Sequence, residues 1–379
     1  MTSVFPALDR RRLLLGAAGW AWGASAAAQG RRASGHRAIA VAQIFDGSVG
    51  QQDVSKDFLI GSRAAWQDIN TKGGVRGNPV QHTTIEVDGT LSSLRAALAA
   101  VRDNPACVAL SGTSGDPAAT SMVRLLRQEN VRIAHAAPWL QDSSIDVDDS
   151  TFPIFAARQE QITHALQSLT MMGVQEIGAI YAADSEQRLY QDDLQRIAGA
   201  LKLKLQSFRG QGGLARLGQQ LTAQTPAILL FIGGTPELVQ FTQGLQKQSR
   251  QRYVVALADV NLQTMMQMGM ARNTPVIATQ PVPMVTASLP IVRAYRETLA
   301  RLFDEQPTPL SLAGFIAARY TFQVLNDIDG ALTRQSVLAA FQRRSSLDVG
   351  GYRVAFGPGR RSGTFVTQSM LTLDGRIVG

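Results

Sequence analysis

One short stretch of this chain combines hydroxyl side chains, glycines and the start of a helix, and it could bind an anion. Residues 111–116, Ser-Gly-Thr-Ser-Gly-Asp, follow an apolar run and precede Pro117, a residue that favours the first turn of a helix. Free backbone amides at a helix start favour negative charge, and the Ser and Thr hydroxyls can donate hydrogen bonds to it. The other interpretation is ordinary capping of the helix by Ser114 or Asp116.

Sequence patterns typical of catalysis do not occur in the chain. No Gly-x-Ser-x-Gly nucleophile motif occurs, and no metal-ligand spacing is found among the histidines, which are His36, His82, His135 and His164. Ser114 has no base that the sequence places beside it, and its turn lacks the Gly-Lys-Thr ending of a nucleotide-binding loop. We therefore predict a binding protein without metal or other cofactor, and not an enzyme. A hydrolase that uses Ser114 is the alternative.

The composition describes a globular chain that is long enough for two domains. It has 379 residues, of which 45% are hydrophobic and 17% are charged. The net charge is +8, but the basic residues are scattered and are not interleaved with aromatics, which indicates a solvated surface and not nucleic-acid binding. Cys107 is the sole cysteine and lies in an apolar run, so we predict an inert buried thiol.

The first residues resemble an export signal. Arg10, Arg11 and Arg12 precede a hydrophobic stretch over residues 13–27, and small residues suited to cleavage end it at Ala28. This pattern predicts a twin-arginine-type signal peptide over residues 1–28, a disordered linker over 29–36 and a periplasmic protein. An uncleaved membrane anchor is the alternative, which the short Ala- and Gly-rich stretch disfavours.

Strand-like and helix-like segments alternate along the rest of the chain, which predicts parallel sheets covered by helices. The alternation runs to about Pro153 and begins again near Ile177, so we expect two α/β lobes. Asp374-Gly375 predicts the turn of a C-terminal hairpin. The expected strands are 38–44, 81–87, 107–111, 131–135, 176–182, 203–208, 227–232, 252–257 and 276–280. The expected helices are 57–71, 91–103, 116–129, 159–172, 187–200, 213–223, 235–248, 288–303, 311–328 and 333–344.

Five segments in order resemble the type I periplasmic solute-binding proteins, in the branched-chain amino-acid (leucine-binding-protein-like) branch. They are residues 68–80, 110–115, 152–158, 311–319 and 347–354. The resemblance covers nearly the whole mature chain. It implies an α/β fold of two doubly wound parallel-sheet lobes joined by a three-segment hinge. The implied lobe 1 is 37–155 plus 283–330, the implied lobe 2 is 156–282 plus 331–379, and the hinge crossings fall near Phe155, Val282 and Gly330.

The same resemblance implies a function in transport. It predicts an extracytoplasmic solute-binding protein of an ABC importer, whose lobes close on a small carboxylate-bearing ligand, either an amino acid or an aromatic or aliphatic acid. The implied partners are that ligand and a membrane permease complex, with the protein itself a monomer. One alternative is a ligand-sensing periplasmic protein that signals to a receptor or regulator. A periplasmic hydrolase is a more distant alternative.

Residue by residue, the resemblance also implies a site in lobe 1. Ser114 matches a serine whose hydroxyl holds the ligand carboxylate, and Ser111 and Thr113 lie in the same turn. Ala137 matches a position whose backbone carbonyl accepts from an ammonium group. Trp139 stands where amino-acid binders carry a small hydroxyl residue, so a flat ligand stacked on it, or packing between the lobes, is expected instead.

Lobe 2 and the first loop supply the other candidates. Glu186 and Thr235 follow predicted strands at positions where relatives place aromatics, and Asp259 lies near the family's ammonium-binding acid. Gln52, in the loop that also holds Gly47 and Ser48, is expected to line the cleft. The alternative roles are an exposed loop acid for Asp184, which begins the turn of Glu186, and for Asp259, and a helix N-cap for Thr235.

Overall fold

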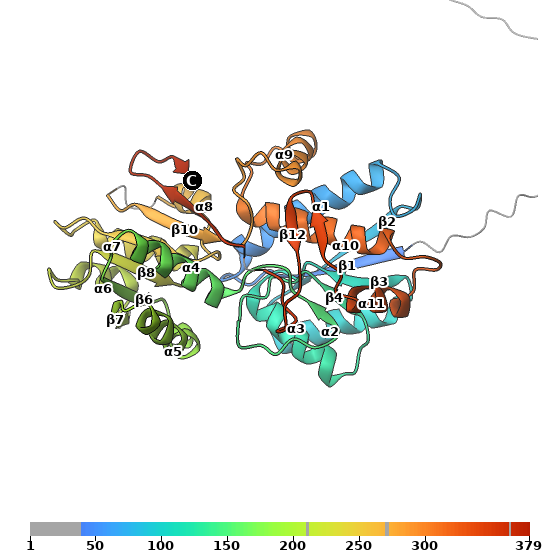
Figure 1. Ribbon diagram of the computed structural model, residues 1–379, viewed down its shortest axis with the longest axis horizontal. Helices are drawn as coiled ribbons and strands as arrows, with labels where there is room; N and C mark the ends of the chain where they lie inside the picture. The colour runs from blue at the N-terminus through green and yellow to red at the C-terminus, as the bar shows by residue number, and fades with distance from the viewer. Residues whose placement is uncertain (1–38, 210–211, 270–272, 364) are drawn as a thin grey trace, which may run out of the picture. The chain divides into compact units, whose positions relative to one another are not determined.

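Two main β-sheets, each covered by helices, organise the protein (Figure 1). The computed structural model describes residues 39–209, 212–269, 273–363 and 365–379. The predicted signal peptide and linker, 1–28 and 29–36, therefore lie outside the described residues. The described residues belong to one compact unit, Arg37–Gly379. The predicted α/β class with parallel sheets is confirmed.

The first sheet has the strand order β2-β1-β3-β4-β5, and all its pairings are parallel. Strand β1, which lies between β2 and β3, is buried along almost its whole length, as expected for a sheet covered on both faces. The strands are β1 (Ile39–Asp46), β2 (Val80–Val87), β3 (Cys107–Ser111), β4 (Ala134–Ala136) and β5 (Thr151–Phe152). This sheet and the helices packed with it are called the first half of the protein. Its helices are α1 (Gln52–Thr71), α2 (Leu91–Asp103), α3 (Asp116–Gln128), α9 (Pro290–Leu302), α10 (Pro309–Asn326) and α11 (Arg334–Gln342).

The second sheet has the order β14-β13-β10-β9-β8-β6-β7, in which the last two strands of the chain pair antiparallel at one edge. Its strands are β6 (Glu176–Tyr181), β7 (Lys204–Arg209), β8 (Ile228–Ile232), β9 (Tyr253–Ala256), β10 (Val276–Gln280), β13 (Thr367–Leu371) and β14 (Ile377–Val378). The helices of this second half are α4 (Arg158–Met171), α5 (Asp184–Ala200), α6 (Leu214–Gln220), α7 (Thr235–Leu245) and α8 (Leu262–Gln267). The predicted C-terminal hairpin turns at Gly375, which has a φ of 79°.

Helices α1 and α10 cross closely in the first half, although they are far apart in the sequence (Figure 1). The crossing depends on glycines, because a Cβ on Gly61 would lie 1.7 Å from the carbonyl oxygen of Ser311. Ser62 adds a hydrogen bond from its Oγ to the carbonyl oxygen of Gly314, at 3.2 Å. The chain that returns from the second sheet therefore completes the core of the first half.

The segment from α11 through the hairpin β11 (Leu347–Val349) and β12 (Tyr352–Val354) also packs in the first half. The Arg334 guanidinium donates to the carbonyl oxygens of Val101, Asn104 and Cys107 at 2.6, 2.7 and 2.8 Å. The ring of Phe341 lies 5.2 Å from that of Phe152. Residues 334–354 thus pack in the first half, whereas the prediction assigned all of residues 331–379 to the second lobe. The chain leaves the first half after β12, and only β13 and β14 join the second sheet.

Three segments connect the halves, and they bind one another. They lie between β5 and α4, between β10 and α9, and between β12 and β13. The Tyr352 Oη donates to the carbonyl oxygens of Ile154, at 2.8 Å, and Pro281, at 3.3 Å. A Cβ on Gly363 would lie 2.5 Å from the carbonyl carbon of Phe155. Two of the predicted crossings, near Phe155 and Val282, fall in these segments. The third crossing was predicted near Gly330, but the chain passes between the halves later, between β12 and β13.

Within the ranges that the structure describes, no helix is both long and apolar enough to cross a membrane.

Candidate functional site

The turn after β3 is held against the end of β1. The backbone N–H of Ser114 donates to the carbonyl oxygen of Ile44 at 3.0 Å, and its own carbonyl oxygen accepts from the N–H of Asp46 at 3.1 Å. Gly115 has a φ of 92°, and a Cβ there would lie 2.7 Å from the Cβ of Asp46. Glycine is therefore required for this turn to approach β1 and then enter α3.

The three hydroxyls of the turn have different surroundings. The Ser111 Oγ lies 2.7 Å from the Oγ1 of Thr321 on α10, inside the first half. The Thr113 Oγ1 lies 2.9 Å from the Nε2 of the buried His135. The Ser114 Oγ is buried and has no hydrogen-bond partner among the described residues. Because a buried polar atom costs free energy unless it is paired, the Ser114 Oγ is the hydroxyl of this turn with hydrogen-bonding capacity left over among the described residues.

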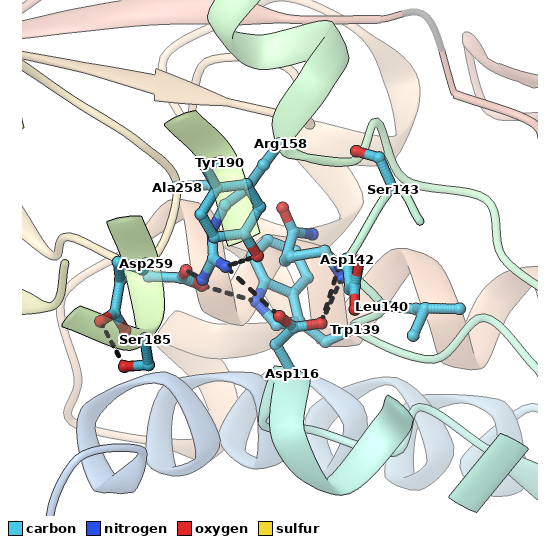
Figure 2. A network of polar contacts seen from close by, with 12 residues as sticks. Asp116, Trp139, Leu140, Asp142, Ser143, Arg158, Ser185, Tyr190, Ala258 and Asp259 are labelled. Atoms are coloured by element: carbon cyan, nitrogen blue, oxygen red, sulfur yellow. Dashed lines mark hydrogen bonds and ion pairs between the residues drawn. The ribbon is translucent and has the colours of Figure 1, made fainter. Parts of the chain in front are cut away.

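A largely buried arginine at the start of α4, Arg158, connects the two halves (Figure 2). The Arg158 guanidinium donates to Asp259 in the second half and, at 3.4 Å, to the Oδ2 of Asp116 on α3. It also donates to the Oη of Tyr190, and its central carbon lies 4.8 Å from the centre of the Tyr190 ring. One cation is thus shared by two carboxylates and an aromatic face.

Asp116 has both carboxylate oxygens engaged. Its Oδ1 accepts from the backbone N–H groups of Gln141, at 2.7 Å, and Asp142, at 3.0 Å, while Oδ2 faces Arg158. Burial raises the pKa of Asp116 to about 6, and the negative charge of Asp259 adds to the effect, whereas Arg158 opposes it. The carboxylate also begins α3, where the helix dipole favours its charge.

Trp139 lies between the halves and is only 1% exposed. Its Nε1 donates to the Oδ1 of Asp259 at 3.2 Å, so both oxygens of Asp259 are engaged by groups of this chain. The indole packs edge-on against Phe58, with ring centres 5.9 Å apart, and lies 5.5 Å from the ring of Phe155. Trp139 therefore packs between the halves, and stacking of a ligand on it stays a prediction.

A second set of polar contacts between the halves lies beside this network. The Thr235 Oγ1 accepts from the backbone N–H of Asn261 at 3.0 Å, and the Asn261 Nδ2 donates to the Oδ2 of Asp57 at 2.8 Å. The same Oδ2 accepts from the Oγ1 of Thr308 at 2.7 Å. Thr235 is the first residue of α7 and does not cap its own helix, in contrast to the alternative role considered for it. Near these residues, a cavity of about 320 Å³ is lined by residues 258, 260–263, 284–286 and 307–310, among others.

Three other predicted residues, Gln52, Glu186 and Ala137, have surroundings of their own. Gln52 is exposed at the start of α1. Glu186, on α5, accepts a hydrogen bond from the Oγ of Ser185 at 2.7 Å. Ala137 follows β4 with a φ of 47°, a strained value for a residue other than glycine, and its N–H donates to the carbonyl oxygen of Phe152 at 2.9 Å. Contact of these three residues with a ligand stays a prediction.

Four residues of these contacts were not among the individually predicted ligand-contact residues: Asp116, Arg158, Tyr190 and Asn261. Two carried a visible signal. Arg158 ends one of the segments that carry the family resemblance, and Asp116 closes the predicted anion-binding turn. Tyr190 carried no local signal. Among the described residues, no group of three His, Cys, Asp or Glu side chains is arranged to hold a metal ion.

Comparison with known proteins agrees with this architecture. A family model described as periplasmic binding protein matches residues 38–372, so the chain belongs to that family. A solved extracellular ligand-binding receptor from Verminephrobacter eiseniae ef01-2 has a TM-score of 0.81 and 18% identity, over 90% of this chain and 100% of that one. The predicted family resemblance and type I periplasmic fold are confirmed.

Two further solved structures share the fold. A substrate-binding periplasmic protein from Ralstonia solanacearum has a TM-score of 0.77 and 20% identity, covering 90% of this chain and 99% of that one. A possible leucine/isoleucine/valine-binding protein from Rhodopirellula baltica SH 1 has a TM-score of 0.78 and 18% identity, covering 91% and 97%. Among curated proteins, none matches this chain.

Proposed function

We propose that this member of the periplasmic binding protein family is the solute-binding component of an ABC importer and closes its two halves on a small carboxylate-bearing ligand. The observation that carries the proposal is the buried Oγ of Ser114, which has no hydrogen-bond partner among the described residues and lies in the turn before α3. A ligand carboxylate there would accept a hydrogen bond from Ser114 and gain from the helix dipole, which contributes up to about 1 kcal/mol at such a position.

The location of Ser114 supports a cleft between the halves. It lies two residues before Asp116, which is linked through Arg158 to Asp259 of the other half. The carboxyl ends of strands in α/β sheets are the usual edges for ligand binding, and Ser114 and Asp259 follow β3 and β9. A ligand bound at this edge would contact both halves.

The connecting segments support closure by hinge motion. Three of them join the halves, and the Tyr352 side chain binds two. A ligand that contacts both halves binds the closed state more tightly than an open one and so shifts the population towards closure. We propose that a membrane permease recognises this closed state, that the protein works in the periplasm as a monomer, and that it catalyses no reaction.

The ligand class can be tested by thermal unfolding of residues 29–379 with amino acids and with aromatic and aliphatic carboxylates. A ligand at a hundredfold excess over its Kd should add about 2.7 kcal/mol to the free energy of unfolding. Ser114→Ala should weaken the binding of a carboxylate at least tenfold, in line with a lost hydrogen bond to a charged group of about 1.5–3 kcal/mol. Ser249→Ala, at an exposed serine, is the control.

Two results would contradict the proposal. Equal binding by Ser114→Ala and the native protein would remove Ser114 from the site. Product formation from a bound ester, lost in Ser114→Ala, would instead support a hydrolase.

A further inference from the structure

We infer that Arg158 is a specificity-determining residue: its guanidinium occupies the cation-binding groups of the cleft, so the ligand is a carboxylic acid that lacks an ammonium group. This inference deepens the proposed function and rests on it. It concerns which carboxylates bind, whereas the proposed function concerns whether a carboxylate binds at all.

The groups that could receive a ligand cation are already engaged by the protein. Asp259 accepts from Arg158 with one oxygen and from the Trp139 indole with the other. Asp116 accepts from Arg158 with one oxygen and from two backbone N–H groups with the other. The ring of Tyr190, a surface to which a cation could bind, lies against the same guanidinium.

Burial makes this arrangement difficult for an ammonium group to replace. The Arg158 side chain is 15% exposed, and each of its two carboxylate partners is 10% exposed. An ammonium that took Asp259 would leave a largely buried guanidinium with fewer partners, and removing one partner of a buried ion pair is destabilising. An ammonium that did not take Asp259 would lose its hydration without a new acceptor.

A donor is still available for an anion. The Ser114 Oγ has no partner among the described residues, and it lies in the turn that begins the helix of Asp116. The partly buried guanidinium of Arg361 donates to the carbonyl oxygens of Leu140 and Asp142 at 3.4 and 2.8 Å, beside the backbone N–H groups that bind Asp116. The cleft therefore offers a donor for a carboxylate and no free acceptor for an ammonium among these groups.

Matched ligand pairs test this inference on the native protein. Leucine is compared with 4-methylpentanoate and 4-methyl-2-oxopentanoate, and phenylalanine with 3-phenylpropanoate, by isothermal titration. We expect the acid of a pair to bind about tenfold or more tightly than its amino acid, the cost of leaving one buried polar group unpaired. Tighter binding of leucine or phenylalanine would overturn the inference. If neither member of any pair bound, the proposed carboxylate ligand would fail, and the inference would fail with it.

Variants of Arg158 test whether this residue causes the preference for acids over amino acids. Arg158→Met keeps much of the side-chain length but frees Asp259 and Asp116, so the amino acid should gain at least tenfold relative to its acid. Arg158→Lys keeps the charge and should keep the preference for acids. An unchanged preference in Arg158→Met, shown by circular dichroism to be folded, would overturn the role of Arg158. If Arg158→Met does not fold, the comparison in the native protein decides.

Discussion

Gly61 on α1 and Gly314 on α10 mark the same helix crossing, at which each glycine lies against the backbone of the opposite helix. A Cβ would lie 1.7 Å from the carbonyl oxygen of Ser311 if added to Gly61, and 1.9 Å from that of Phe58 if added to Gly314. Such distances are far below van der Waals contact, and backbone atoms cannot move aside as a flexible side chain can. The packing of α1 against α10 therefore requires glycine at both positions.

We predict that Gly61→Ala and Gly314→Ala each lower the free energy of unfolding by about 3 kcal/mol, the upper range for overpacking a core. Gly199→Ala is the matched control, because Gly199 lies in α5 and its Cβ would meet no atom within 4 Å. That variant should gain about 0.5–1 kcal/mol, since alanine favours a helix over glycine. Urea unfolding measures all three. Equal stability of Gly61→Ala and Gly199→Ala would contradict the close crossing.

His135 should make the protein sensitive to acid. Burial lowers the pKa of His135 to about 3, against a usual value near 6.5. As the pH falls, the unfolded chain therefore takes up the proton first. The contribution of neutral His135 to the free energy of unfolding is complete above about pH 6.5 and falls as the pH drops towards 3. At pH 5 the loss should be about 2 kcal/mol. His135→Gln should remove about 2 kcal/mol of the fall in stability between pH 7 and pH 5, while the fall due to His82, whose pKa burial lowers to about 4, should remain. If the slope of His135→Gln equals that of the native protein, His135 is not responsible.

Asp68, on α1, is a buried carboxylate bound by three cations. Lys72 lies 2.8 Å and Arg301 2.6 Å from its oxygens, and Arg319 contacts it as well. Burial would raise the pKa of Asp68, but the hydrogen bonds from Lys72 and Arg301 and the charge of Arg319 outweigh that effect and hold it below the usual value. The stabilisation is therefore complete above the unfolded pKa near 3.8 and is lost as the pH falls below it.

We predict that Asp68→Asn lowers the free energy of unfolding at pH 7 by about 3 kcal/mol, because it leaves the largely buried Arg319 with a neutral partner. The control is Asp103→Asn, whose carboxylate is 71% exposed and pairs with Arg102 at the surface. That pair should contribute less than about 1 kcal/mol. Urea unfolding at pH 7 compares the two variants. A cost for Asp68→Asn no greater than for Asp103→Asn would show that the cluster does not stabilise the fold.

Tyr352 should stabilise the segments that connect the two halves. Tyr352→Phe removes the hydrogen bonds to the carbonyl oxygens of Ile154 and Pro281 and leaves these oxygens without that donor. We expect a loss of about 1–3 kcal/mol in the free energy of unfolding. Hydrogen exchange should also be faster in residues 153–157 and 281–285. Tyr253→Phe, at a tyrosine that is 42% exposed, is the control. Unchanged exchange in both segments would contradict this role.

Local sequence patterns predicted most elements of the two sheets. The predicted strand 276–280 coincides with β10, and the predicted helices 288–303 and 333–344 lie within two residues of α9 and α11 at each end. The two-residue strand β5 was missed, because so short a segment has no periodicity to detect. The six-residue helix α8 was missed as well, although Asn261 caps it by accepting from the N–H groups of Gln263 and Thr264.

Long-range partners could not be predicted in the same way. Nothing near Arg334 in the sequence indicates that its guanidinium binds the end of α2, so the third crossing was expected too early. Asp259 and Trp139 were selected by resemblance and do contact one another. Their shared neighbour Arg158 was not selected, because two carboxylates from separate parts of the chain meet only after folding.

The first half is built from segments that are far apart in the sequence, and this affects the order of folding. Residues 158–280 form most of the second sheet from one continuous stretch, whereas the first half must wait for α10, α11 and the β11–β12 hairpin. Distant contacts form slowly, because the entropy of closing a long loop is lost before the contacts are gained. We expect the second half to gain its structure first during synthesis and refolding. Trp66 and Trp139 both lie in the first half, so their fluorescence should follow the later event.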